Sequence, residues 1–149
     1  MKKLTVIAFA SVLLAACSSP EKDALKAQGF TRAEQALETA QRNATVACRD
    51  AAQCSAMWDM TKRYIEQNSN QPVIRADADA IESDLPSRSG KPVYSATRVA
   101  KGNGATISLY AQCRGMYGPE RAKGSDYDDC ASKIIAVQNR FASAIQPPR

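Results

Sequence analysis

Cysteine is the residue type with the most chemistry to offer in this 149-residue sequence, which contains five cysteines and no histidine. Without histidine, the chain lacks the usual general base, the imidazole of a catalytic triad and the most common metal ligand. A cysteine can carry a lipid, form a disulfide or bind zinc as a thiolate. The spacing of the five cysteines therefore decides which chemistry is open to the chain.

The last four cysteines have a spacing that favours disulfides over zinc. A zinc site with four cysteine ligands typically uses pairs separated by two to four residues. Here five residues separate Cys48 from Cys54, and sixteen separate Cys113 from Cys130. An even number of cysteines in an oxidising compartment is typical of a disulfide framework. We expect two disulfides. Of the three possible connectivities we favour the sequential one, which ties a helix start to the segment entering it and clamps a strand to a helix.

Two carboxylates, Asp77 and Asp79, lie two residues apart in a predicted strand, about 7 Å between their Cα atoms. A calcium-binding EF-hand loop would need glycine where Glu82 stands. Glycosidase carboxylates flank the scissile bond from its two sides, which neighbours on one strand face do not. We interpret this pair as a solvated strand face. The sequence thus predicts no catalytic residue, no metal site and no cofactor, and we do not expect an enzyme.

The N-terminus has the form of a secretory signal. Lys2 and Lys3 precede thirteen uncharged residues, 4–16, which are too few to span a membrane. The following Leu14-Ala15-Ala16-Cys17 resembles the bacterial lipobox. The resemblance implies that the Cys17 thiol receives a diacylglyceryl group and that the chain is cut before it. Ser18, in place of an aspartate that would resemble an inner-membrane retention signal, favours sorting to the outer membrane, with the domain facing the periplasm.

Three segments follow from this interpretation: a lipoprotein signal peptide over 1–16, a lipidated tether over 17–29 and one disulfide-stapled domain over 30–149. The 133 residues from Cys17 onward carry a formal charge of +3. That excess is too small to argue for nucleic acid as a partner. The expected membrane contact is the N-terminal lipid anchor. Anionic lipid headgroups nearby could also attract the small positive charge, without specificity.

Hydrophobic periodicity predicts two helices, then three strands, then a helix. The predicted elements are helices over about 31–44 and 50–68, strands over about 73–81, 93–100 and 105–113, and a helix that starts at Ser125. After Gly29, Thr31 to Glu34 has the form of a capping box, and Asp50 can cap the second helix with Gln53 at the reciprocal position. Apolar stripes at helical spacing predict the buried faces of the second and last helices; they include Met57, Trp58 and Ile65, and Ile134 and Phe141. Asn103-Gly104 between the last two strands is a strong hairpin signal. The order predicts an α+β fold: two N-terminal helices, a three-stranded antiparallel sheet and a C-terminal helix packed on one sheet face.

The stretch ATVACRDAAQCSAMW, with Cys48, Cys54 and Trp58, precedes a hairpin rich in threonine, isoleucine and tyrosine that ends in cysteine. This pattern, over residues 44–113, resembles a family of short uncharacterised lipoproteins from Gram-negative bacteria. The resemblance implies a compartment and an architecture, but no activity.

A basic loop beside the predicted Cys113–Cys130 disulfide is the candidate binding surface; it holds Arg114, Tyr117, Arg121 and Lys123. The alternative is local charge compensation by the aspartates that follow. If the loop is only a connector, the wet sheet face around Thr106, Ser108 and Tyr110 is the next candidate. We expect a binding or scaffolding module of the cell envelope with a protein or glycan partner; the alternative is an inhibitor of an enzyme that attacks the envelope or belongs to a competitor.

Overall fold

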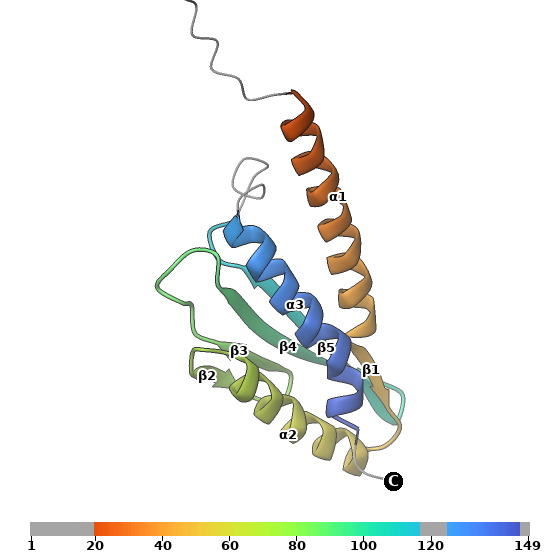
Figure 1. Ribbon diagram of the computed structural model, residues 1–149. Coiled ribbons are helices and arrows are strands. Elements are labelled where there is room, and N and C mark those ends of the chain that lie inside the picture. Colours follow the sequence, from red (N-terminus) through yellow and green to blue (C-terminus); the bar gives the residue numbers. More distant parts are fainter. Residues whose placement is uncertain (1–19, 117–124, 147–149) are drawn as a thin grey trace, which may run out of the picture.

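The computed structural model describes residues 20–116 and 125–146, which form three helices and one five-stranded sheet (Figure 1). The elements are α1 (Pro20–Asn43), β1 (Thr45–Cys48), α2 (Ala51–Asn68), β2 (Val73–Ala76), β3 (Ala80–Ser83), β4 (Pro92–Lys101), β5 (Gly104–Cys113) and α3 (Ser125–Ala144). All neighbouring strands are antiparallel, in the order β1-β5-β4-β3-β2. Within the described ranges, no helix is both long and apolar enough to cross a membrane.

The fold is α+β with an antiparallel sheet, but the predicted three-stranded sheet and the two consecutive N-terminal helices are wrong. The sheet has five strands, and β1 separates α1 from α2. β1 has only four residues, too few for its alternation to stand out in the sequence. Its place is set by pairing with β5, from Thr45 opposite Ser108 to Cys48 opposite Ala105.

α1 begins at Pro20, eleven residues before the predicted capping box at Thr31. Proline suits a first helical turn, because it has no N–H to leave unpaired there. The prediction of a helix start after Gly29 is therefore wrong. Instead of capping the helix, the Thr31 hydroxyl donates to the Ala27 carbonyl within it (3.0 Å).

The segment predicted as one strand over 73–81 is a hairpin, in which β2 and β3 are joined by a turn. The Asp77 carboxylate makes this turn: its Oδ1 accepts from the N–H groups of Asp79 (2.9 Å) and Ala80 (2.8 Å). Aspartate often bonds the backbone two residues on and so favours turns. The Asp79 N–H and the Arg75 guanidinium (2.7 Å) lower the pKa of Asp77 to about 2. Asp77 and Asp79 are exposed, as predicted, but they lie in a turn, so their assignment to a strand face is wrong.

The β4–β5 hairpin turns one residue earlier than Asn103-Gly104. Lys101 pairs with Gly104, so Gly102 and Asn103 are the central residues. Gly102 has a φ of 59°, which glycine adopts without steric cost. Gly104 lies against the backbone of Cys48, on the neighbouring edge strand. The hairpin tip is therefore packed directly onto β1.

All three helices lie on one side of the sheet, and α1 extends past the sheet at its N-terminal end (Figure 1). The core between the layers includes Trp58 from α2, Phe141 from α3, and Tyr94, Ile107 and Leu109 from the sheet. The Trp58 indole N–H donates to the Asp77 carbonyl (2.8 Å), so α2 also fixes the β2–β3 turn.

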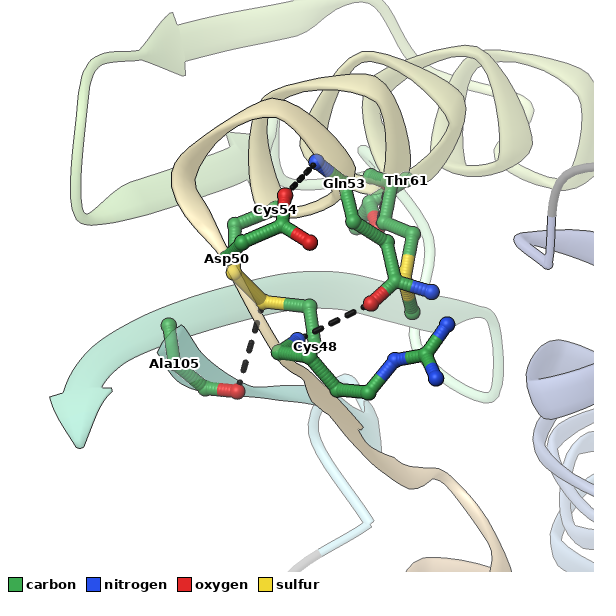
Figure 2. Close-up of a disulfide and its surroundings, with 8 residues drawn as sticks. Cys48, Asp50, Gln53, Cys54, Thr61 and Ala105 are labelled. Atoms are coloured by element: carbon green, nitrogen blue, oxygen red, sulfur yellow. Dashed lines mark hydrogen bonds between the residues drawn. A yellow bond between two sulfur atoms is a disulfide. The ribbon is translucent and has the colours of Figure 1, made fainter. Parts of the chain in front are cut away.

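Both disulfides join the cysteines in the favoured sequential order. Cys48–Cys54 ties the end of β1 to the first turn of α2 (Figure 2). In the same turn Asp50 caps α2 by accepting from the Gln53 N–H (2.9 Å), as predicted from their spacing. Cys113–Cys130 joins the end of β5 to α3, with 6.0 Å between Cα atoms. The first disulfide therefore fixes one edge strand, and the second fixes the sheet against α3.

Candidate functional site

The basic loop lies mostly outside the described residues: Tyr117, Arg121 and Lys123 fall in 117–124. Arg114 is described and half-buried. Its N–H donates to the Lys91 carbonyl (2.9 Å), and its carbonyl accepts from the Gly90 N–H (2.8 Å). The backbone of Arg114 therefore continues the pairing of β5 with the β4 side.

The described part of the chain has an open sheet edge along the end of β5. β1 pairs with β5 only from Ala105 to Ser108, and the last contact is the Leu109 N–H donating to the Ala44 carbonyl (2.9 Å). Beyond this point α1 replaces β1, and no other described strand lies on that side of β5. Residues two apart on a strand direct their backbone groups to the same side. Ala111 therefore directs its N–H and carbonyl to the open edge.

Two glutamines close the edge at Leu109. The Leu109 carbonyl accepts from Nε2 of Gln41 on α1 (3.0 Å) and Nε2 of Gln138 on α3 (3.2 Å). Gln138 also donates to Oε1 of Gln41 (2.8 Å) and is only 1% exposed. At the other end of the edge, the Cys113 carbonyl accepts from the Met116 N–H (3.3 Å). The backbone groups of Ala111 and the Cys113 N–H thus lie between two closed positions.

A cavity of about 410 Å³ lies on the helix side of this edge, between α1, α3 and β5. Its apolar lining includes Leu37, Met116 and Ile134, and its charged lining residues are Glu34 and Glu38, with no lysine or arginine among the described residues that line it. We call it the helix-side cavity. The charge of its described lining is negative.

Tyr127 fixes one wall of the helix-side cavity, because its hydroxyl donates to the Glu34 carboxylate. Burial, and then the bond to Glu34, raise the pKa of Tyr127 above its ordinary value. The tyrosine is therefore a neutral hydrogen-bond donor that does not offset the charge of the Glu34 carboxylate. The Glu38 carboxylate forms an exposed ion pair with Arg42 of the same helix.

A second cavity, of about 300 Å³, lies at the same part of β5 on the sheet face that carries none of the three described helices. Its lining includes Tyr110, Val93 and Ser95, and we call it the open-face cavity. It shares three lining residues with the helix-side cavity: Gln41, Ala111 and Gln112. The two cavities therefore flank residues 110–112 of β5 from opposite faces.

Of the residues predicted on the wet sheet face, the structure brings Tyr110 to this site but not the other two. Tyr110 is 44% exposed. Ser108 is only 9% exposed, because β1 pairs beside it and its hydroxyl lies 3.1 Å from that of Thr45. Thr106 is half-buried and lies opposite Ala47 of β1, outside both cavities.

No pattern in the sequence indicated Gln41, Gln138 or Ala111 as site residues. Glutamine and alanine carry no motif of their own, and Gln41 is 68 residues from the carbonyl that it caps. One sequence signal for the site was present, because the alternation of residues 105–113 predicted the two faces of β5. Which stretch of its edge stays open depends on where β1 ends.

Comparisons with known protein families, with curated proteins and with solved structures find no match. What the site can bind is therefore inferred from the chemical groups that it contains. These are main-chain donors and acceptors, two carboxylates, amides and two tyrosine rings. No cluster of three metal-ligating side chains occurs within 20–116 and 125–146. The arrangement of these groups is suited to binding.

Proposed function

We propose that the protein is a lipoprotein, anchored to the outer membrane through Cys17, that binds a protein partner at the open edge of β5. The observation that carries this proposal is the position of Ala111. Its main-chain groups lie between two cavities, at a strand edge with which no described strand pairs. Strand edges are usually blocked, because they pair readily with other chains. An edge left open beside two cavities is suited to recognition.

The start of α1 supports a short connection to the membrane. Only two residues separate Cys17 from Pro20, and residues 20–29 of the helix are all exposed. Packing begins at Phe30, whose ring lies 5.5 Å from that of Tyr127. Ten helical residues span about 15 Å. With the anchor at Cys17, α1 is a stiff arm, and a partner would be bound close to the bilayer.

Replacement of Cys17 by serine tests the anchor. We expect Cys17→Ser to leave the signal uncut or to release the protein from the membrane fraction, because serine cannot form the thioether. Fractionation and the mass of the purified chain measure this. Ser18→Ala is the matched control and should behave like the wild type. A Cys17→Ser protein that is cut and remains with the outer membrane would contradict the proposed lipid anchor at Cys17.

Capture of a partner from envelope extract tests the site. The variant combines Tyr110→Ala with Glu38→Ala, both at exposed side chains of the two cavities. Loss of an aromatic anchor at an interface costs about 2 kcal/mol, so we expect about thirtyfold weaker capture. The matched control combines Val99→Ala, 62% exposed on the same sheet face, with Glu66→Ala on α2.

The control variant should capture the partner like the wild type. Equal capture by the Tyr110→Ala, Glu38→Ala variant would reject the open edge of β5 as the binding site. A host or competitor hydrolase as the captured partner, with loss of its activity, would favour an inhibitor over a scaffold.

A further inference from the structure

We infer that the partner segment is an extended, positively charged peptide that adds to the edge of β5 as an antiparallel strand. This inference rests on the proposed function and specifies how the same site binds. In strand addition, main-chain hydrogen bonds provide affinity, and pockets for alternate side chains provide specificity. The edge of β5 has both of these features.

Main-chain hydrogen-bonding groups are available along the end of β5. Leu109 is closed by Ala44 and by the two glutamines, and the Cys113 carbonyl is taken by Met116. The N–H and carbonyl of Ala111 and the N–H of Cys113 remain directed to the edge. An added strand can therefore form up to three main-chain hydrogen bonds. The Cys113–Cys130 disulfide holds this end of β5 against α3, so the edge is ordered before binding.

The two cavities match the side-chain alternation of a strand. Successive side chains of an extended chain point to opposite faces. A strand beside residues 110–112 would direct every second side chain into the helix-side cavity and the others into the open-face cavity. In an antiparallel pair, the residue that exchanges hydrogen bonds with Ala111 has its side chain on the same face as Ala111. That face is the helix side, where Ile107 and Leu109 are also buried.

The charge of the helix-side cavity selects the side chains that enter it. Glu34 and Glu38 are its only charged residues in the described chain. A lysine or arginine can lay its apolar stem on Leu37 and Met116 and bring its charged end to these carboxylates. The ion pair of Glu38 with Arg42 is exposed, and such pairs are weak enough to exchange. The open-face cavity, with Val93 and the ring of Tyr110, favours an apolar side chain.

Capped hexapeptides test the inference on the purified mature lipoprotein in detergent micelles. The probe alternates lysine and valine. One modified probe carries N-methyl groups on all lysines, and another carries them on all valines. An antiparallel strand with lysines in the helix-side cavity uses the lysine N–H groups toward β5. We therefore expect lysine N-methylation to weaken binding at least tenfold and valine N-methylation to change it less than twofold.

Charge is tested by a probe that alternates glutamate and valine, and by Glu34→Gln combined with Glu38→Gln. Both should weaken binding about tenfold, because each of the two exposed ion pairs changes a binding constant by about fivefold at most. Glu66→Gln on α2 is the control and should bind the lysine–valine probe like the wild type. Amide hydrogen exchange gives a second readout: the Ala111 N–H should exchange fast in the free protein and slowly with the probe bound.

Equal binding of the unmodified and both methylated probes would overturn strand addition. The proposed function would still stand if Tyr110→Ala with Glu38→Ala abolishes capture of the partner. Loss confined to the valine-methylated probe would overturn the antiparallel direction. Equal binding of the glutamate–valine probe would overturn the charge preference. A dimer of the free protein that the probe does not dissociate would assign the edge to a second copy and overturn the inference.

Discussion

Replacing Cys113 and Cys130 with alanine is expected to lower the free energy of unfolding by about 3 kcal/mol, since the disulfide closes a loop with a sequence separation of 17. Without the crosslink, the unfolded chain gains entropy that the folded chain does not. Cys130 is fully buried, so the loss of its sulfur also removes packing from the core. Urea unfolding of both oxidised proteins, followed by circular dichroism, measures the change.

The matched variant replaces Cys48 and Cys54, whose sequence separation is 6, and should lose about 2 kcal/mol. A larger loss from this pair than from Cys113 and Cys130 would contradict the loop-closure explanation. The two pairs also differ in their effect on the binding site. Only Cys113 lies at the open edge of β5, so only its variant should weaken binding of the lysine–valine probe while the sheet stays folded.

The second large effect is expected for Gly104→Ala, at about 3 kcal/mol of lost unfolding free energy, the upper end for overpacking. A Cβ at Gly104 would overlap the backbone carbonyl of Cys48, and backbone cannot move aside as a flexible side chain can. Gly104 is not among the described glycines with positive φ, so its backbone conformation suits alanine and the obstacle is steric. Thermal or urea unfolding measures the loss.

Substitutions at two other glycines distinguish a steric clash from backbone strain as the cause of the lost stability. Gly102→Ala meets open space but has a φ of 59°, so it should cost about 1 kcal/mol through backbone strain. Gly29→Ala also meets open space, inside α1, and should gain up to about 1 kcal/mol through helix propensity. If Gly104→Ala is no more harmful than Gly102→Ala, the close approach of the hairpin to β1 is not what holds glycine there.

Several local features could be predicted from the sequence because neighbouring residues determine them. The stripe of α2 that contains Met57, Trp58 and Ile65 is buried, as its spacing predicted. The same is true of the α3 stripe, including Ile134 and Phe141. In each case a period of 3.6 residues places the apolar side chains on one face, and the core covers that face. The cysteine pairing follows from the same elements, since each pair joins residues that the order of elements brings together.

The sequence-based prediction of strands failed where a strand is short or where one side chain redirects the backbone. β1 is recognisable only through its partner β5, because four residues do not establish a pattern. The stretch 73–81 alternates like one strand, but the Asp77 carboxylate bonds to the next backbone N–H groups and turns the chain. Local hydrogen bonds of this kind compete with extended structure, and alternation alone does not reveal them.

The sequence by itself determined the chemistry that is present: four cysteines that pair, no histidine, and helices with apolar faces. Only the tertiary structure decided where a partner could bind. Ala111 becomes a candidate binding group because β1 stops beside Ser108, and because Gln41 and Gln138 close the edge at Leu109. Those contacts join residues 29 to 68 positions apart. A strand edge is free where no neighbouring strand pairs with it. Whether a strand pairs there depends on packing between segments that are distant in the sequence, and not on the side chains of the edge itself.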